Sequence, residues 1–237
     1  MEVTIIIPSR IGSTRLPRKS LLELDGKPIA YLIYEKCYKW GKANNVFVAT
    51  DSEEIKEAVE SRGGKAIMTS VDHENGTSRC FEAFEKIGSP SGILMNIQGD
   101  EPFIENNHLD CLLDTLVLNS HIDVSTTLYK IKDENDLKSD SVVKGDFNTE
   151  DKRINEFSRS PISEFGHMGV YGFGTELLEK IKSLPSTKRE VEERLEQLKW
   201  MEGGLTIGGG LVPNKTIAID VLSDYEKAKE LIKNMVG

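Results

Sequence analysis

The sequence predicts an α/β fold, in which a doubly wound and mostly parallel sheet is covered by helices. Three short apolar runs indicate the buried strands, at residues 3–7, 46–49 and 93–97. Each run is nearly continuous and β-branched or aromatic, as in strands that a parallel sheet buries on both faces. Helical segments fall between the runs, and this alternation is the order of a doubly wound layer. Ligands bind beyond the carboxyl ends of strands in such folds, so the loops after the three runs are candidate binding loops.

The helices of the first half are indicated by their starts. Pro28 begins a segment that reaches Trp40, and proline is favoured there because the first helical residues have no amide partner in the helix. Residues 51–54 offer a capping side chain with an acid three residues on, which predicts a second helix. A third helix is predicted over residues 77–87.

The second half is less regular. Residues 125–131 and 168–173 are predicted strands. Residues 187–190 resemble a capping box, which predicts one helix from there to about Trp200, and residues 223–226 begin a C-terminal helix in the same way. Neither an internal repeat nor a Pro-rich linker divides the chain. We therefore expect a single domain over residues 1–237, with an inserted antiparallel subregion at roughly 121–175.

The composition excludes several classes of protein. With 38% apolar and 29% charged residues, the chain is unlike disordered, collagen-like or disulfide-stapled proteins. No apolar stretch approaches the ~18 to 20 residues that a bilayer requires, and no basic leader precedes the first strand. The three cysteines lie far apart without CxxC spacing, which favours reduced thiols over a disulfide framework or a zinc site. We expect a soluble, cytoplasmic protein with no membrane partner.

The net charge of −9 repels nucleic acids and other polyanions at long range, so we expect no nucleic-acid partner. An anionic ligand then needs a local cluster of cations. The loop at residues 8–19 supplies one, with Arg10, Arg15, Arg18 and Lys19 beside glycine and small hydroxyl residues that let the backbone approach a phosphate. Its spacing is not that of a P-loop. A solvated basic loop is the alternative interpretation.

Short motifs continue from this loop in one order along most of the chain. They are Pro8-x-Arg10-x-x-Ser13-Thr14-Arg15-Leu16-Pro17-x-Lys19, Leu24-x-Gly26-Lys27-Pro28, Val48-Ala49-Thr50-Asp51, Gly76-Thr77-x-Arg79, Asn96-x-Gln98-Gly99-Asp100-Glu101-Pro102, Phe157-Ser158-Arg159-Ser160-Pro161-Ile162, His167-x-Gly169-x-Tyr171 and Leu195-Glu196-Gln197-Leu198. In this order the motifs resemble those of the 3-deoxy-manno-octulosonate (Kdo) cytidylyltransferase family. The resemblance implies a Rossmann-like nucleotidyltransferase fold and a homodimer.

The resemblance also implies roles for residues near the ends of the predicted strands. The nucleotide would be bound by Pro8, Arg10, Ser13, Arg15, Lys19, Gly76, Thr77 and Arg79, whereas His73 in the same region has no implied role and is expected at the surface. The catalytic residues would be Arg10, Lys19 and Asp100. Asp100 and Asp220 would hold Mg²⁺, because this hard cation prefers oxygen ligands. The family's Thr-Pro-Glu after the second aspartate is here Val221-Leu222-Ser223, so Asp220 also fits a turn or N-cap.

Six residues fall on family positions that line the pocket for the acidic sugar: Gln98, Arg159, His167, Tyr171, Glu196 and Gln197. Arg159 suits a carboxylate, and the amide, imidazole and carboxylate groups suit several hydroxyls. Read without the family, His167 is also consistent with a structural histidine and Glu196 with an exposed helix acid.

The implied reaction transfers CMP from CTP to a 3-deoxy-2-ulosonic acid, Kdo or a Kdo-like sugar, and releases pyrophosphate, for lipopolysaccharide or surface-polysaccharide synthesis. One alternative is an acylneuraminate-type cytidylyltransferase for a nine-carbon acid sugar. Another is a nucleotide-sensing module without catalysis. Both aspartates and the basic loop are present, which favours an Mg²⁺-dependent enzyme.

One departure from the family lies before His167, where the family usually has a longer segment after its Ser-Pro-Ile-Pro turn. The shortened loop places Glu164 in this region. Glu164 is expected either to pair with an amine on a modified ulosonic acid or to be a surface glutamate in a tight turn.

Overall fold

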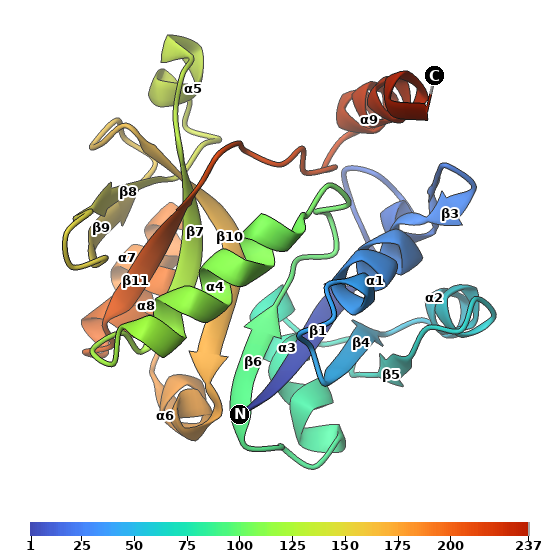
Figure 1. Cartoon of the computed structure of the whole chain (residues 1–237), viewed down its shortest axis with the longest axis horizontal. Helices are drawn as coiled ribbons and strands as arrows, with labels where there is room; N and C mark the ends of the chain where they lie inside the picture. The colour runs from blue at the N-terminus through green and yellow to red at the C-terminus, as the bar shows by residue number, and fades with distance from the viewer. Residues whose placement is uncertain (237) are drawn as a thin grey trace. The chain divides into compact units, whose positions relative to one another are not determined.

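The computed structural model describes residues 1–236 and divides into two compact units (Figure 1). The first unit comprises Met1–Asn106 and the segment that begins at Thr216, and the second comprises Asn107–Lys215. Over the described residues, no helix combines the length and the apolar character that a membrane span requires. The single domain with an insert at roughly 121–175 stays a prediction.

Parallel strands form the sheet of the first unit. β1 (Glu2–Ser9) lies between β4 (Asn45–Thr50) and β6 (Gly92–Asn96), and β5 (Ala66–Met68) pairs with the other side of β4. β1 is buried from its second residue to its last, as its continuous apolar run predicted. The three strands predicted for this half are confirmed.

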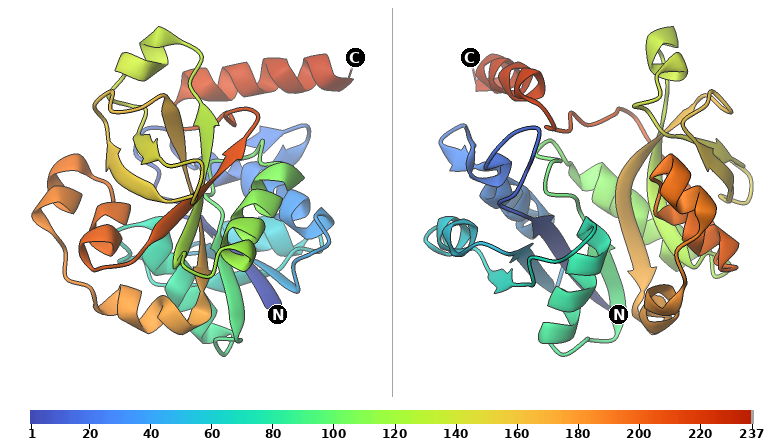
Figure 2. Two further views of the ribbon diagram at one scale, coloured as in Figure 1. Left: turned by 60° about the vertical axis from the view of Figure 1, so that its left-hand side comes forward. Right: turned by 180° about the vertical axis from the view of Figure 1, so that it is seen from behind.

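Helices α1 (Ile29–Lys39), α2 (Glu53–Glu60) and α3 (Gly76–Lys86) connect these strands. Such crossovers are right-handed, so the direction of each step along the sheet decides which face its helix covers. The steps from β1 to β4 and β5 run one way and the step from β5 to β6 runs back, which places α1 and α3 on opposite faces (Figures 1 and 2). The doubly wound, mostly parallel class is confirmed. The order in which the chain adds strands to the sheet reverses between β1 and β6, which are themselves parallel.

Two further parts of the first unit adjoin the loop after β1. A 3₁₀ helix, η1 (Lys19–Leu21), ends this loop, and the antiparallel pair β2 (Glu23–Leu24) and β3 (Lys27–Pro28) leads into α1. At the other end of the described chain, α9 (Leu222–Val236) belongs to this unit.

The second unit contains the antiparallel pairing that was predicted. β7 (Val124–Lys130) pairs in parallel with β11 (Ile207–Val212) and antiparallel with β10 (Phe165–Gly174). β8 (Lys144–Phe147) is antiparallel to β9 (Ile154–Ser158) and touches β10 through the pair Gly166 and Lys144. The two strands predicted here are confirmed, and β10 begins three residues earlier than predicted.

The helices of the second unit are α4 (Asn106–Leu118), α5 (Glu134–Lys138), η2 (Thr175–Leu177), α6 (Leu178–Ser183), α7 (Lys188–Glu193) and α8 (Gln197–Glu202). The capping box at Thr187 is present, but the single helix from there to Trp200 is wrong. Arg194 adopts a left-handed conformation with φ 56° and ends α7, and the chain restarts as α8. A left-handed residue is a common helix end, but here it is not the glycine that sequence patterns would detect.

The C-terminal helix is capped differently from the prediction. Ser223 lies inside α9, whereas the carboxylate of Asp224 accepts hydrogen bonds from the backbone N–H groups of Asp220 and Val221, both at 3.1 Å. The carboxylate satisfies amides at the start of the helix, where negative charge is favourable. This contact also fixes the backbone of Asp220.

Candidate active site

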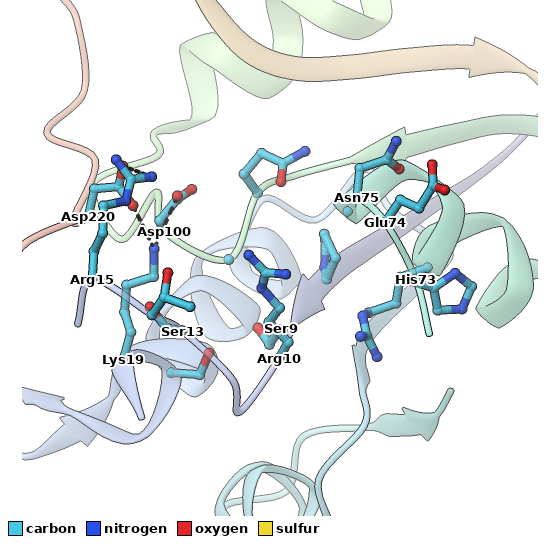
Figure 3. A pocket seen from close by; sticks show the side chains of 17 residues that line it. Ser9, Arg10, Ser13, Arg15, Lys19, His73, Glu74, Asn75, Asp100 and Asp220 are labelled. Carbon is cyan, nitrogen blue, oxygen red and sulfur yellow. Dashed lines mark hydrogen bonds and ion pairs between the residues drawn. The ribbon is translucent and has the colours of Figure 1, made fainter. Parts of the chain in front are cut away.

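A pocket of about 210 Å³ opens in the first unit, at the carboxyl ends of β1 and β6 (Figure 3). Three loops and Asp220 line it, and the loops cover residues 8–20, 73–79 and 98–100. The order of the strands reverses between β1 and β6. Doubly wound folds bind ligands at this point. Of the predicted nucleotide and metal residues, Pro8, Arg10, Ser13, Arg15, Lys19, Gly76, Arg79, Asp100 and Asp220 line the pocket.

Two glycines let the three loops pack closely. A Cβ on Gly99 would collide with the Pro8 carbonyl oxygen. A Cβ on Gly76 would lie 2.8 Å from Gln98 Oε1 and 3.0 Å from Pro8 Cγ, closer than side-chain carbons approach in practice. The floor of the pocket therefore depends on close packing between the loops after β1 and β6 and the start of α3.

One end of the pocket is a cluster of opposite charges (Figure 3). Lys19 Nζ lies 3.2 Å from Asp100 Oδ2 and 3.5 Å from Asp220 Oδ1, and Arg15 Nη2 lies 2.6 Å from Asp220 Oδ2. The N–H of Ile219 donates to the Asp100 carbonyl at 2.8 Å, which brings the C-terminal segment to the loop after β6. Two carboxylates and two cations balance in this cluster.

The carboxylate pair has the chemistry of a magnesium site. Asp100 and Asp220 present hard oxygen ligands, and no group of three or more His, Cys, Asp or Glu side chains in the described chain could hold a metal ion. Magnesium usually binds through one or two carboxylates together with substrate phosphates. The pair therefore fits Mg²⁺ that arrives with a phosphate ligand better than a metal held by protein groups alone.

Arg10 and Arg18 differ although both belong to the basic loop. Arg10 is exposed, lines the pocket, and has no ion pair or hydrogen bond from its side chain within residues 1–236. Arg18 adopts a left-handed φ of 57°, and its guanidinium pairs with Glu54 outside the pocket. A glycine would adopt this backbone conformation without strain. Arg10 is thus available to an anion in the pocket, whereas Arg18 is not.

Arg79 and Thr77 are buried and bonded to the protein. Arg79 lies 3.0 Å from Asp51 Oδ2 and donates to Thr69 Oγ1 at 2.6 Å, and Asp51 also accepts from the Ile11 N–H at 3.0 Å. Arg79 and Asp51 therefore connect the basic loop to the segment before α3. Thr77 accepts from Asn96 Nδ2 at 2.9 Å and does not line the pocket.

His73 is a pocket residue that the sequence interpretation placed at the surface without a role. Its Nδ1 lies 3.1 Å from Ser78 Oγ and its Nε2 bonds to Glu82. Burial opposes ionisation of Glu82, yet hydrogen bonds from Lys86, His73 and the Ser70 backbone lower its pKa to about 2. The partners lie five and nine residues after His73, a spacing that spans a loop and two helical turns and matches no common motif.

His73, Glu74 and Asn75 lie at the opposite end of the pocket from the charged cluster, and Ser9 and Arg10 lie between them (Figure 3). The pocket therefore has a charged end, where cations pair with carboxylates, and a polar end, where an imidazole, an amide and the Glu74 carboxylate offer hydrogen bonds. A nucleotide has the same division, with phosphates at one end and a hydrogen-bonding base at the other.

The second unit brings three of the predicted sugar residues together. Tyr171 Oη donates to Gln197 Oε1 at 3.1 Å, and the rings of His167 and Tyr171 are 5.7 Å apart. Tyr171 is 3% exposed, so its hydroxyl orients Gln197. Burial, and then the charge of Glu196, raise the pKa of Tyr171, which keeps it neutral. Gln197 Nε2 is buried and has no hydrogen-bond partner among the described residues.

The protonation of His167 follows from its surroundings. Burial lowers the pKa of His167 to about 3, so the ring is neutral. Thr126 Oγ1 donates to the Val170 carbonyl at 2.7 Å and lies 2.9 Å from His167 Nε2. The hydroxyl has one proton, so the hydrogen-bond network assigns the donor to Nε2–H and leaves Nδ1 as an acceptor.

Three further residues that were considered for the sugar, Arg159, Gln98 and Glu164, are bonded to other groups of the protein. Arg159 donates from Nε to the Glu193 carbonyl at 2.9 Å and from Nη1 to the Asp140 carbonyl at 2.8 Å. Gln98 belongs to the first unit, where its Nε2 lies 3.3 Å from Asn96 Oδ1. Glu164 is exposed and pairs with Lys130 at 3.1 Å, as a surface glutamate would.

Comparisons with known proteins cover the whole chain. A family model described as Cytidylyltransferase matches residues 4–207. The 3-deoxy-manno-octulosonate cytidylyltransferase of Phocaeicola vulgatus is 36% identical, with 100% of both chains covered, and that of Bacteroides thetaiotaomicron is 38% identical, with 99% of both covered.

Solved structures with a similar fold include cytidylyltransferases. One described as CMP:2-keto-3-deoxy-manno-octonic acid synthetase complexed with CTP matches with a TM-score of 0.93 and 34% identity, over 99% of this chain and 100% of that chain. A cytidylyltransferase from Leptospira borgpetersenii has a TM-score of 0.66 at 23% identity, over 99% of this chain and 87% of that chain, and shares the fold.

Proposed function

The chain belongs to the 3-deoxy-manno-octulosonate cytidylyltransferase family, and from this premise we propose that it transfers CMP from CTP to Kdo and releases pyrophosphate. The product is an activated sugar for lipopolysaccharide synthesis. The pocket with one charged end and one polar end carries this proposal. Full-length identity to Kdo enzymes favours this reaction over an acylneuraminate-type transfer and over nucleotide sensing without catalysis.

The triphosphate occupies the charged end of the pocket. Arg10, Arg15 and Lys19 neutralise its oxygens through charge-assisted hydrogen bonds. Ser13 and the backbone around Pro8 and Gly76 border the nucleotide. Arg79 supports the nucleotide-binding loops from within the protein, because its guanidinium is bonded to Asp51 and Thr69.

Asp100 and Asp220 hold Mg²⁺ in this proposal. The bound metal would polarise the α-phosphate and lower the pKa of the attacking hydroxyl. Triphosphate oxygens compete for the cations that neutralise the two aspartates, Lys19 and Arg15. Transfer of these cations to phosphate exposes the carboxylate oxygens at the moment when the metal and nucleotide arrive.

The acidic sugar is bound by residues of the second unit. Arg159 pairs with the sugar carboxylate. His167 Nδ1 accepts a hydrogen bond from a hydroxyl, Gln197 Nε2 donates one, and Glu196 accepts another. Tyr171 acts by orienting Gln197, which it contacts directly.

The reaction is an in-line displacement at the α-phosphorus. The anomeric hydroxyl of the sugar attacks, an oxygen–phosphorus bond forms, and the bond to the bridging oxygen of the β-phosphate breaks. Pyrophosphate leaves with that oxygen, and the hydroxyl proton passes to solvent. Catalysis is mainly electrostatic, through the cations that surround the phosphates.

The proposal also includes a cytoplasmic homodimer. The resemblance to the family supports the homodimer, and the use of CTP, a cytoplasmic nucleotide, supports the location. Light scattering coupled to size exclusion measures the mass directly. Twice the chain mass supports the dimer, and the mass of one chain contradicts it.

A pyrophosphate-release assay with purified protein tests the reaction. CTP, UTP, ATP and GTP are each combined with Kdo or with N-acetylneuraminate, in the presence of Mg²⁺ or EDTA. We expect release with CTP, Kdo and Mg²⁺ together. Faster release with N-acetylneuraminate, or release without any sugar, would contradict the proposal.

A further inference from the structure

Lys144 on β8 is a completely buried lysine that the proposed reaction does not use. Its exposed fraction is 0%, and no carboxylate of the described residues lies within ion-pair distance. Burial of an ammonium is unfavourable unless hydrogen bonds compensate it. Burial also lowers the pKa of Lys144. A methionine of similar length would fill the same space without this cost, so the ammonium itself has a purpose.

The ammonium makes two short hydrogen bonds to backbone oxygens. Lys144 Nζ donates to the Ser139 carbonyl at 2.7 Å and to the Arg159 carbonyl at 2.8 Å. The two acceptors lie on different segments, one before β8 and one directly after β9. Lys144 thus joins the turn before β8 to the turn after β9.

The turn before β8 and the end of helix α7 hold the Arg159 side chain. Arg159 Nη1 donates to the carbonyl of Asp140, the neighbour of Ser139, at 2.8 Å, and Nε donates to the Glu193 carbonyl at 2.9 Å. Lys144 therefore fixes the backbone of Arg159 and, through Ser139, the segment that accepts from its guanidinium. With Nε and Nη1 occupied, Nη2 keeps its donors for an incoming carboxylate.

We propose that Lys144 is a positioning residue, which orients the Arg159 guanidinium toward the carboxylate of the acidic sugar by holding the two turns on either side of it. This inference rests on the proposed function, since it needs Arg159 to bind the sugar. Ordering an arginine before the ligand arrives reduces the entropy lost on binding. Loss of Lys144 also removes the ammonium donor of the Arg159 carbonyl, whereas the Ser139 carbonyl keeps the Val142 N–H at 3.1 Å.

The test compares steady-state kinetics of Lys144→Met with the wild type. We expect KM for Kdo to rise about 10-fold, the scale of a lost charge-assisted hydrogen bond, with KM for CTP within about 2-fold. Lys138→Met removes an exposed lysine that pairs with Glu134 at 3.3 Å and should leave both constants unchanged. Equal increases in both KM values for Lys144→Met would overturn the inference and indicate general loosening of the fold.

A double-mutant cycle tests whether Lys144 acts through Arg159. Arg159→Met should raise KM for Kdo strongly in the wild type but add little in the Lys144→Met background. Full additivity of the two effects would overturn the inference. If Lys144→Met does not fold, Lys144→Arg carries the test, because arginine keeps two donors at a displaced position. A raised KM for Kdo alone then supports the inference, and an unchanged one overturns it.

Pyrophosphate release by the wild-type protein distinguishes failure of this inference from failure of the proposed function. If wild-type protein releases no pyrophosphate from CTP and Kdo, the proposed function fails. If it does, and Lys144→Met has a wild-type KM for Kdo, only the positioning role fails.

Discussion

The two parts of the candidate site are built on opposite principles. The first-unit pocket is charged, with Arg15 67% and Asp220 37% exposed at their side chains. The second-unit group is neutral and enclosed, since burial keeps His167 unprotonated and Tyr171 is 3% exposed. Exposed ion pairs contribute little to stability, so their members change partners readily. Buried hydrogen bonds fix donors and acceptors in advance.

The comparison relates each of the two groups of residues to the chemistry of a different substrate. A triphosphate offers strong negative charge and can take Lys19 and Arg15 from the aspartates. A sugar offers hydroxyls, whose recognition requires donors and acceptors already in place. Five single variants test this contrast, beginning with the largest expected effect on activity.

Asp100→Asn should abolish pyrophosphate release, with a loss of about three orders of magnitude or more, because it removes a charged metal ligand at constant volume. Pyrophosphate release at saturating Mg²⁺ measures the loss, and thermal melting checks that the fold survives. The double variant with Asp220→Asn should add little, since both residues serve one ion. Turnover close to wild type in Asp100→Asn would refute the metal assignment.

Lys19→Met should reduce kcat/KM for CTP about 100-fold, because Lys19 balances both aspartates and then the phosphates. In nucleotide-free protein the same variant should bind Mn²⁺ about 10-fold more tightly, since Asp100 loses a competing cation. Electron paramagnetic resonance of free Mn²⁺ measures this affinity.

Arg18→Met is the matched control for Lys19→Met, since it changes the net charge equally but lies outside the pocket in a pair with Glu54. It should alter neither Mn²⁺ affinity nor kcat/KM by more than about 2-fold. Equal changes in the two variants would mean that the total charge of the basic loop determines Mn²⁺ affinity and kcat/KM. Exchange of Lys19 from the aspartates to the phosphates would then have no role.

Tyr171→Phe should raise KM for Kdo by about 5- to 10-fold and leave KM for CTP unchanged, because Gln197 loses the hydroxyl that orients it. Steady-state kinetics in each substrate provide the measurement. An unchanged KM for Kdo would show that Gln197 is oriented without Tyr171, or that it does not bind the sugar.

His167 is expected to act on stability, and its effect is seen in the pH dependence of unfolding. Its folded pKa of about 3 lies below the unfolded value of about 6.5, so the unfolded state binds more protons between these values. Stability from His167 is therefore present above about pH 6.5 and is lost as the pH falls toward 3, by at most about 1.4 kcal/mol per unit. Urea unfolding at pH 7 and pH 5 should show a steeper loss in wild type than in His167→Gln. Parallel losses would show that His167 ionises equally in both states.

The sequence predicts the first unit better than the second for a physical reason. Strands buried on both faces need continuous apolar runs, and β1, β4 and β6 have them. The break at Arg194 has no such signal, because its left-handed backbone is imposed by surrounding structure. The capping box at Thr187 is local in sequence and was correctly predicted, whereas the end of its helix was not.

The candidate site likewise has features that the sequence predicts and features that it does not. The charge of the loop at residues 8–19 is visible in the sequence, but its pairing with Asp100 and Asp220 depends on how distant segments meet. The buried roles of Thr77 and Arg79 and the contact of His73 with Glu82 also arise from packing. Family motifs supply the proposed site residues, and the fold supplies their partners.

Phosphorus NMR of a reaction with CTP, Kdo and Mg²⁺ tests the central claim most directly, because it follows the α-phosphorus itself. The account predicts that its anhydride signal is replaced by a single phosphodiester signal, with an equal amount of pyrophosphate. Free CMP in place of the diester, or an α-phosphorus signal that persists after long incubation, would contradict it.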